Sequence, residues 1–373
     1  MTTLLAAFLA IAVPAGLAGQ GDGAATKDQG GAREAAALKQ GARPELSLLG
    51  PLIDRAVSIV EPCVVTVEPF GGYEYDPKKE EQGGRQPRTP RPDQLGPLTP
   101  QQFLKGRGAS TGLIVGADGW ILTTRFVTRV NPTSIIVTLS DGRKFTAERK
   151  GEDRSRGIAL LKIDADALPV PEFVPQKDVV VGQWSFALGR TFGARRPTVH
   201  AGIVSALGRI DGKAVQTDAY TSPVNYGGPL IDLEGRVLGL VCPLSPRGDT
   251  AGADWYDSGI GFAAGLADLG EILDGLKEGK VFKKGLLGVA PSPGDLGPGA
   301  VIARTPRRTT PAGHAGMRKG DKILAVDGAE VRNPAHLQWL IGGRYEGDLV
   351  ELRYERKKDQ TVVEVWVELD GRD

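Results

Sequence analysis

The sequence predicts a mainly β fold, and three observations lead to this prediction. Short runs of β-branched and apolar residues recur along the chain, separated by turns such as Asp118-Gly119 and Asp141-Gly142. The 52 glycines among 373 residues supply the many turns that such a fold needs. Strands and helices do not alternate regularly, so a parallel α/β sheet is not expected. The pattern indicates a barrel or a sandwich.

The predicted elements follow one another along the chain. Strands are expected at residues 63–67, 111–115, 120–123, 134–139, 144–148 and 158–163, in a second set between 179 and 262, and at 350–353 and 362–367. Helices are expected at residues 45–60, 267–280 and 333–341. Asn333 is the expected N-cap of the last helix, with Pro334 in its first turn, because these residue types favour those positions.

Length and composition set the number of domains and disfavour some partners. A chain of 373 residues exceeds one ordinary core, so two domains with linkers are expected. Hydrophobic residues make up 40% and charged residues 24%, both ordinary for a globular protein. The net charge of +1 favours neither nucleic acid nor an anionic membrane as a partner.

The N-terminal segment predicts export. Residues 1–18 are apolar over 4–13 and end in small residues, as a secretory signal peptide does, and an uncleaved anchor is the alternative. Residues 19–44 are expected to be a flexible leader, and residues 71–105, rich in proline, glycine and charge, a long mobile loop. We therefore expect a periplasmic or extracellular protein.

The cysteines and histidines do not indicate a metal site. Cys63 and Cys242 each lie in an apolar, strand-like run, which favours two buried thiols over a disulfide. The three histidines are scattered, and no His, Cys or carboxylate group has metal-ligand spacing. The sequence therefore predicts neither a metal nor another cofactor.

Several motifs in a fixed order carry a resemblance to a known family. Residues 119–123 read G-W-I-L-T, residues 158–163 read I-A-L-L-K-I, residues 201–206 read A-G-I-V-S-A, and residues 217–230 read T-D-A-Y-T-S-P-V-N-Y-G-G-P-L. Over roughly 46–276 the chain is similar to the HtrA (DegP-like) family of trypsin-fold serine proteases. The resemblance implies a domain over 45–278 with two β-barrels of the trypsin (chymotrypsin) type and a cleft between them.

The positions that hold the catalytic triad in that family carry other residues here. The frame of the family's T-N-N-H-V-V places Phe126 at the histidine, and the frame of R-T-D-L-A-L-L-K places Gly157 at the aspartate. Tyr226 stands at the nucleophile, and Val224 at the glycine whose N–H helps bind the oxyanion. A serine triad needs an imidazole to accept the proton and a carboxylate to orient it. The sequence therefore predicts no catalytic residue at these positions.

Two alternatives remain open for this cleft. Phe126 and Tyr226 either pack into it, which is favoured, or line a binding surface. The polar residues that a shifted site could use are Asp153, Asp118, His200, Ser222 and Ser205. The two aspartates stand in turn-like stretches, which favours solvated side chains, and a lone strand histidine favours a structural role.

Residues 283–370 resemble the PDZ domains appended to HtrA proteases. Residues 311–328 read P-A-G-H-A-G-M-R-K-G-D-K-I-L-A-V-D-G, against P-A-x-x-A-G-L-x-x-G-D-x-I-L-x-V-N-G in the family. A PDZ domain adds an extended peptide to a strand and captures its C-terminal carboxylate with a loop. The residues that the resemblance assigns to peptide binding are Leu286, Leu287, Gly288, Val289, Leu337, Leu340 and Ile341. A PDZ fold used only for packing is the alternative, since Pro291 and Pro293 remove N–H donors after Val289.

Together these observations favour an exported HtrA-like pseudoprotease that is not an enzyme and binds peptides or protein C-termini. Its expected role is in protein quality control, or as a regulator or subunit of an active protease. The expected assembly is a homotrimer or a hetero-oligomer with an active HtrA-like protease. The alternatives are a serine-type endopeptidase with an unconventional active site and a purely structural subunit.

Overall fold

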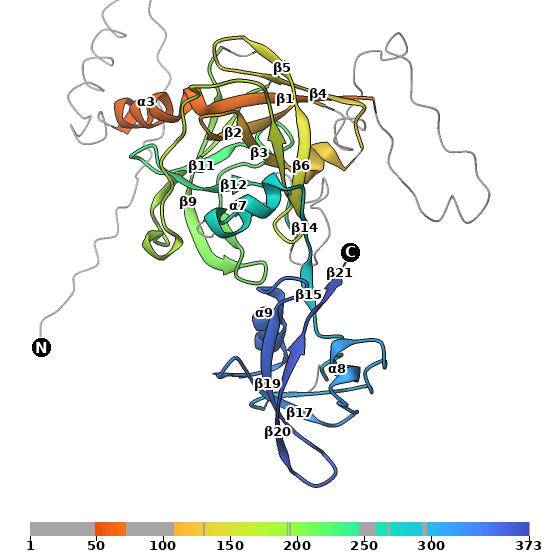
Figure 1. The fold of residues 1–373 in the computed structure, drawn as a ribbon. Coiled ribbons are helices and arrows are strands. Elements are labelled where there is room, and N and C mark those ends of the chain that lie inside the picture. Colours follow the sequence, from red (N-terminus) through yellow and green to blue (C-terminus); the bar gives the residue numbers. More distant parts are fainter. Residues whose placement is uncertain are drawn as a thin grey trace, which may run out of the picture. The chain divides into compact units, whose positions relative to one another are not determined.

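The β-branched runs form strands in the order that the sequence predicts, as the computed structural model shows (Figure 1). The model describes residues 49–71, 108–129, 131–191, 193, 195–245, 259–266, 269–292 and 297–372. The expected signal peptide, leader and almost all of the expected loop at 71–105 lie outside the described residues. The described elements from Pro51 onward belong to one unit, Pro51–Asp373.

Seven strands from the first half of the chain and the later strand β14 form an eight-stranded sheet in the order β14-β6-β7-β3-β2-β1-β4-β5. Its strands are β1 (Val64–Phe70), β2 (Ser110–Gly116), β3 (Trp120–Thr124), β4 (Ser134–Thr138), β5 (Lys144–Thr146), β6 (Glu148–Asp153), β7 (Ile158–Lys162) and β14 (Val281–Phe282). Helix α3 (Leu49–Val60) and the 3₁₀ turn η1 (Glu61–Cys63) lead into β1. The short helix α6 (Arg125–Thr128), which the sequence did not predict, follows β3.

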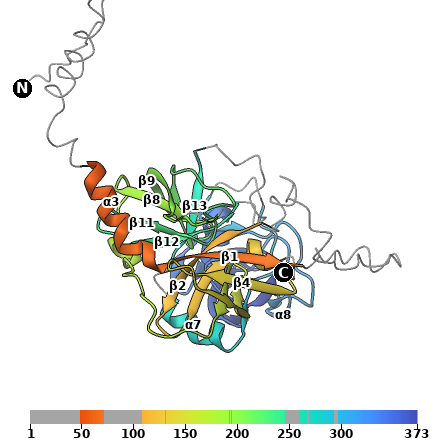
Figure 2. The ribbon, with the colours of Figure 1, turned by 90° about the horizontal axis from the view of Figure 1, so that it is seen from above.

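The second set of strands closes into a barrel in the order β10-β13-β12-β11-β8-β9. Its strands are β8 (Trp184–Gly189), β9 (Thr198–Arg209), β10 (Ala214–Thr217), β11 (Pro229–Ile231), β12 (Val237–Val241) and β13 (Gly261–Ala264), with the turn η3 (Gln176–Asp178) before them. Seen from above, β8, β9, β11, β12 and β13 gather apart from β1, β2 and β4 (Figure 2). The prediction of a mainly β fold is therefore confirmed. Of the two expected architectures, a barrel and a sandwich, the structure has barrel-like sheets.

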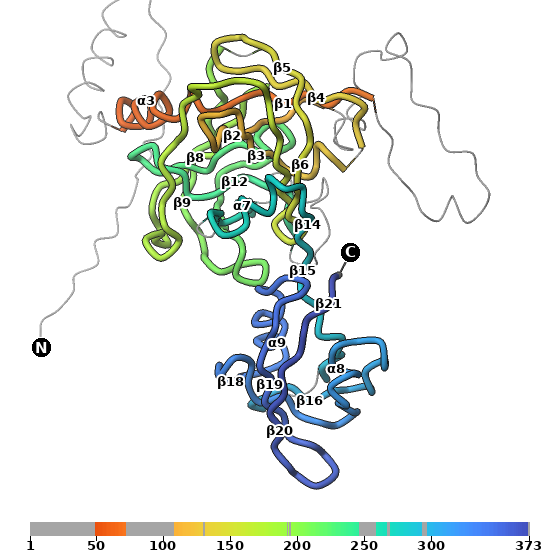
Figure 3. The backbone as a smooth tube through the Cα atoms, in the orientation of Figure 1, coloured from red at the N-terminus to blue at the C-terminus, as the bar shows by residue number. Residues whose placement is uncertain are grey.

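After the barrel, the chain passes through α7 (Leu269–Lys277) and β14 into a smaller group of elements (Figure 3). These are β15 (Lys284–Leu286), β16 (Ala300–Val301), α8 (Pro311–His314), β17 (Lys322–Val326), β18 (Ala329–Glu330), α9 (Pro334–Gly342), β19 (Leu349–Glu355), β20 (Val362–Glu368) and β21 (Asp370–Arg372). The side chain of Asn333 accepts a hydrogen bond from the N–H of His336 (2.9 Å), which confirms the predicted N-cap of α9.

Three apolar clusters lie beneath these elements. The first packs the eight-stranded sheet against α3 and α7 and includes both cysteines. The second fills the closed barrel, and the third lies between α9 and strands β16, β17, β19 and β20. Cys63 and Cys242 are free thiols, and burial raises the pKa of Cys63 to about 11 and that of Cys242 to about 12. Both are therefore small buried apolar groups, as the sequence favours.

The helices of the described part of the chain are short. None of them is long and apolar enough to cross a membrane.

Candidate functional site

Two aromatic rings meet inside the closed barrel at the positions expected for a histidine and a nucleophile. Phe126 lies in α6, where its N–H donates to the N-cap side chain of Thr124 (3.1 Å). Tyr226 lies in the turn before β11. The ring centroids are 5.6 Å apart at an interplanar angle of 75°, an edge-to-face arrangement. Phe126 is 5% and Tyr226 2% exposed, so both rings belong to the barrel core.

The turn that carries Tyr226 is fixed by backbone hydrogen bonds. The N–H groups of Asn225 and Tyr226 both donate to the carbonyl of Ser222, at 3.0 and 3.1 Å. The carbonyl of Tyr226 accepts from the hydroxyl of Ser110 (2.7 Å) and from the N–H of Thr111 (3.1 Å). The N–H at the expected nucleophile position is therefore engaged within its own turn.

Gly227 and Gly228 hold the same turn close to two neighbouring strands. Gly227 has a φ of +82°, and a Cβ there would lie 2.2 Å from the carbonyl oxygen of Thr111. A Cβ on Gly228 would lie 2.0 Å from the carbonyl oxygen of Leu188. Only glycine tolerates this approach. Backbone packing therefore accounts for the Gly-Gly pair independently of the residue before it.

Gly157 and Val224 contribute backbone contacts rather than ionisable groups. Gly157 has a φ of +70°, and its carbonyl accepts from the N–H of Arg125 (2.8 Å) and from the hydroxyl of Thr124 (3.2 Å). Val224 does not have a positive φ, and its carbonyl accepts from the hydroxyl of Thr111 (2.7 Å). The assignment of Phe126, Gly157, Val224 and Tyr226 to the family's catalytic positions stays a prediction.

The polar residues that the sequence offers for a shifted catalytic site differ in their burial and contacts. Asp118 is exposed, as expected, and accepts from the indole N–H of Trp120 (2.8 Å). His200 is half-buried on β9 with its ring edge-on to that of Tyr220, at 6.3 Å. The half-buried Ser205 also lies on β9, and Ser222 contributes its backbone to the turn of Tyr226. The expectation for Asp153 is wrong, since this carboxylate is 0% exposed.

Asp153 is buried because the turn after β6 folds around it. Its Oδ1 accepts from the N–H and the hydroxyl of Ser155, at 2.8 and 2.6 Å, and from the N–H of Arg156 (3.1 Å). Its Oδ2 accepts from Arg156 Nη1 (3.2 Å) and from the hydroxyl of Tyr345 (2.7 Å). These contacts replace the water that a buried carboxylate would lose. The Asp-x-Ser spacing in the sequence could have predicted the contact between Asp153 and Ser155. The contact between Asp153 and Tyr345 could not be predicted, because the two residues are far apart in the chain.

Lys213, in the turn between β9 and β10, completes this polar cluster. Its Nζ donates to the hydroxyl of Ser155 (2.9 Å) and lies 4.0 Å from the ring centroid of Tyr345. The side chain is 6% exposed, and burial lowers the pKa of Lys213 to about 8, against the opposing effect of Asp153. We call Asp153, Ser155, Arg156, Lys213 and Tyr345 the polar cluster.

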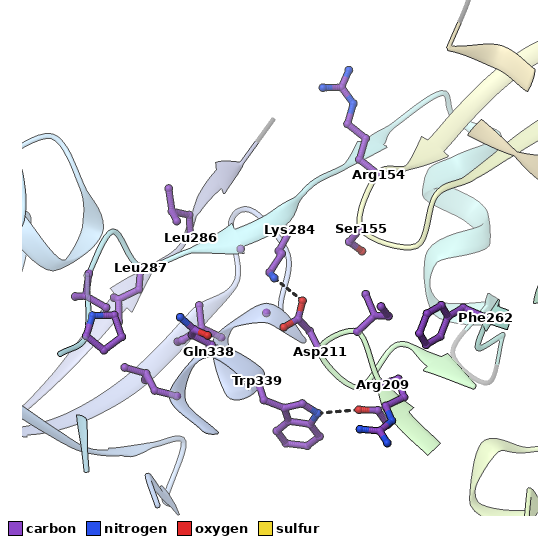
Figure 4. A pocket seen from close by; sticks show the side chains of 18 of the residues that line it. Arg154, Ser155, Arg209, Asp211, Phe262, Lys284, Leu286, Leu287, Gln338 and Trp339 are labelled. Carbon is purple, nitrogen blue, oxygen red and sulfur yellow. Dashed lines mark hydrogen bonds and ion pairs between the residues drawn. The ribbon is translucent and has the colours of Figure 1, made fainter. Parts of the chain in front are cut away.

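A pocket of about 880 Å³ brings together residues from the barrel, from the β6–β7 turn and from the smaller group of elements (Figure 4). The Lys284–Asp211 ion pair crosses it, and the indole N–H of Trp339 donates to the carbonyl of Gly208 (3.3 Å). Ser155 lies on its wall, with Arg154 nearby.

Most of the predicted peptide-binding residues line this pocket. Those that do are Leu286, Leu287, Gly288, Val289, Leu337 and Ile341. Leu340 does not, and instead packs against the apolar cluster beneath α9. Gly288 has a φ of +79°, and a Cβ there would lie 2.4 Å from the Cβ of Thr310, so the loop needs glycine.

Comparison with known families places this arrangement in a class. The model of the trypsin-like peptidase domain matches residues 110–240, and that of the PDZ domain matches residues 285–367. The fold and the site thus define a trypsin-like peptidase domain followed by a PDZ domain.

Individual relatives narrow the class. A probable periplasmic serine endoprotease, DegP-like, from Halomonas elongata is 34% identical over 276 residues, which cover 70% of this chain and 56% of the relative. A protein of the same name from Hahella chejuensis is 33% identical, over 70% of this chain and 57% of its own length. The solved HtrA-type protease AlgW with tripeptide superposes with a TM-score of 0.63 and 26% identity, over 86% of this chain and 97% of that chain. The chain is similar to HtrA/DegP-like proteases, and it spans little more than half the length of these curated relatives.

These relatives correct one expectation. The interpretation that the protein is not an enzyme is contradicted, because the relatives are named serine endoproteases and the solved neighbours are HtrA-type proteases. The predicted domain bounds of 45–278 and 283–370 stay predictions.

Proposed function

We propose that this chain is an exported HtrA-like protein that binds peptides or protein C-termini through its PDZ domain. The observation that carries the proposal is the pocket in which residues 286–289 face Leu337 and Ile341 of α9. Backbone N–H groups of such a loop can bind a terminal carboxylate, and the two apolar side chains can contact the last side chain of the peptide.

Residues 287–290 form no strand in the structure, contrary to the expectation of one from Val289, and this limits how much of a peptide can pair with them. Pro291 has no N–H to donate, and it already bridges Ile302. Main-chain pairing would therefore involve only the residues next to Val289. We expect recognition to depend mainly on the carboxylate and the terminal side chain.

Fluorescence polarisation with labelled peptides tests this proposal. Peptides with a free C-terminus and an apolar last residue should bind about tenfold or more tightly than their C-terminal amides, which is ~1.4 kcal/mol. Ile341→Ala should weaken binding, whereas Leu340→Ala should not because Leu340 does not line the pocket. Thermal melting must show that Ile341→Ala is folded at the assay temperature, since Ile341 also belongs to the apolar core. Equal binding of acids and amides, or no binding at all, would contradict the proposal and favour a purely structural subunit.

We also propose that the chain is a serine-type endopeptidase with an unconventional active site. The naming of its relatives as serine endoproteases supports this. A phenyl ring cannot accept a proton and glycine can orient no base, so the chemistry would use groups other than those at 126 and 157.

Cleavage of unfolded casein tests this second proposal. Wild-type protein should cleave casein, a fluorophosphonate should inhibit the cleavage, and Tyr226→Phe should leave the rate unchanged because it removes only the hydroxyl. Loss of cleavage in Tyr226→Phe would show that this hydroxyl is used after all. Absence of cleavage by the wild type would refute the activity.

We further propose a periplasmic or extracellular location, and a role in protein quality control or as a regulator or subunit of an active protease. The naming of the relatives as periplasmic supports the location.

A homotrimer, or a hetero-oligomer with an active relative, would cover the exposed apolar residues Val180, Val181 and Trp184. Light scattering of the purified chain, alone and mixed with an active HtrA-like protease, should show a mass above that of the monomer.

A further inference from the structure

A serine and a lysine from different parts of the fold meet in the polar cluster. Ser155 comes from the β6–β7 turn of the eight-stranded sheet, and Lys213 from the β9–β10 turn of the closed barrel. The Nζ of Lys213 lies 2.9 Å from the Oγ of Ser155, which is the distance at which a base can take a hydroxyl proton. The pairing depends on the tertiary fold, since 58 residues separate the two in the chain.

Ser155 lies at the pocket wall and Lys213 is buried behind it, as expected for a nucleophile and its base. Ser155 is half-buried and lies on the wall of the 880 Å³ pocket (Figure 4). Lys213 is buried behind it and does not line the pocket. A buried amine beside a hydroxyl at the pocket wall is protected from bulk water, which favours its neutral form.

The charged and aromatic groups around Lys213 come from three parts of the chain. Asp153 and Arg156 face it from the β6–β7 turn, Asp211 from its own turn, and Lys284 and the ring of Tyr345 from beyond β14. Burial has the largest effect on the lysine, and Arg156 and Lys284 act in the same direction, while Asp153 and Asp211 oppose them. At a pKa of about 8, roughly a tenth of the Lys213 side chains would be neutral at pH 7.

We propose that Ser155 is the nucleophile and Lys213 the general base of an acyl-transfer site that takes peptide or ester carbonyl groups. This inference rests on the endopeptidase activity proposed above, and names the groups that perform it. Serine–lysine pairs are one of the recurring forms of the serine nucleophile with its base.

The reaction balances with water as the only co-reactant. The hydroxyl of Ser155 first turns from Asp153 toward the neutral Nζ of Lys213, and its Oγ then forms a bond to the carbonyl carbon while the proton passes to that Nζ. The bond from carbon to the leaving nitrogen then breaks, and Lys213 returns the proton to that nitrogen. Water attacks the acyl group, gives one proton to Lys213, and releases Ser155 when the bond between carbon and Oγ breaks and the Oγ regains that proton.

Asp153 is a positioning residue in this scheme. Its Oδ1 accepts from the hydroxyl of Ser155 at 2.6 Å, which holds the Oγ beside Lys213. The same carboxylate lies close enough to Lys213 to stabilise its protonated form after the proton has moved.

The test is covalent labelling by a fluorophosphonate, read by mass spectrometry of the full chain and its peptides. Wild-type protein should carry the label on Ser155, and Ser155→Ala should lose it. The matched control is Ser140→Ala, an exposed serine bonded to the carbonyl of Pro62 (3.3 Å), which should label as the wild type does. Thermal melting establishes that each variant is folded.

The base is tested by the pH profile of labelling. The rate should rise with pH and level off above about 8, as Lys213 loses its proton. Lys213→Arg keeps the charge but cannot act as a base, so it should slow labelling about 100-fold or more and abolish the rise near pH 8.

The outcomes separate this inference from the proposed function. Casein cleavage that continues in Ser155→Ala would overturn the inference and leave the endopeptidase proposal standing. Label on Ser155 without casein cleavage would support the site and refute the endopeptidase. A wild-type protein that neither cleaves nor labels would refute both.

Discussion

The Phe126–Tyr226 pair and the polar cluster are two interior regions of one fold that are stabilised in opposite ways. The aromatic pair belongs to an apolar core, and its two rings interact edge to face. In the polar cluster the buried carboxylate of Asp153 pairs with the guanidinium of Arg156, and the ammonium of Lys213 donates to the hydroxyl of Ser155. The difference teaches that the expected catalytic positions have become core, while charged groups lie buried a few residues away. Burial alone therefore does not decide which region is capable of chemistry.

The largest expected effect is in the aromatic pair. Phe126→Ala and Tyr226→Ala should each lower the free energy of unfolding by about 3–5 kcal/mol, because each leaves a cavity in a packed core. Tyr220→Ala is the control and should change it by less than about 0.5 kcal/mol, since Tyr220 is exposed. Urea denaturation measures all three. A change below 1 kcal/mol in the first two variants would show that the rings do not stabilise the core.

A double-mutant cycle on the same pair sharpens this result. The coupling energy between Phe126 and Tyr226 should be about 0.5–1.5 kcal/mol, as for other edge-to-face contacts. Chemical denaturation of the wild type, the two single variants and the double variant measures this energy. A coupling energy near zero would show that the edge-to-face contact adds nothing beyond the burial of the two rings.

A smaller effect is expected from one hydroxyl of the polar cluster. Tyr345→Phe removes a donor to Asp153 and an acceptor for Arg156, both at 2.7 Å, and keeps the ring beneath Lys213. The loss in the free energy of unfolding should be about 1.5–3 kcal/mol, as for hydrogen bonds to charged groups. Tyr220→Phe is the control, because Tyr220 is exposed. An unchanged stability would mean that water replaces the hydroxyl without cost.

The clearest contrast with the aromatic pair concerns Lys213, whose effect on stability depends on pH. Its folded-state pKa of about 8 lies below the ordinary 10.5, so between these values the unfolded chain binds more protons than the folded one. Stability should therefore rise with pH from about 8 to 10.5, by up to about 3 kcal/mol, and remain at its lower level below pH 8. Lys213→Met should lack this rise. Comparing the two proteins by denaturation at each pH removes the contribution of other titrating groups, and parallel curves would contradict the prediction.

The sequence predicted the strands well because each carries its own signal. The β-branched runs at 63–67 and 158–163 became β1 and β7 within a few residues, and the Asn-Pro pair at 333–334 began α9 as predicted. The site was predicted only in part. Tyr226 and Phe126 could be singled out by their local motifs, but Asp153 was expected in solvent because its two partners, Lys213 and Tyr345, come from distant turns. The periodicity of the sequence contains no information on contacts between such distant turns.

The peptide groove shows the same limit on a smaller scale. Residues 286–289 and α9 were assigned by resemblance, and helical spacing made Leu337, Leu340 and Ile341 equivalent candidates. Only the rotation of α9 against the strands decides their places: Leu337 and Ile341 are buried in the apolar cluster and also line the pocket, whereas Leu340 packs half-buried against the cluster away from the pocket. That rotation is set by tertiary packing, which the spacing does not contain.

The strand β14 has a consequence for any attempt to separate the two halves of the chain. It pairs in parallel with β6, joining Val281 to Glu152 and Phe282 to Asp153, and so forms the outermost strand of the first sheet. A chain cut at residue 278 would lose this strand and leave one edge of β6 without a partner, and other chains can add to such an unpaired edge. Proteolysis between α7 and β14 would therefore yield an N-terminal fragment that tends to aggregate. A fragment intended to stay monomeric should retain Phe282.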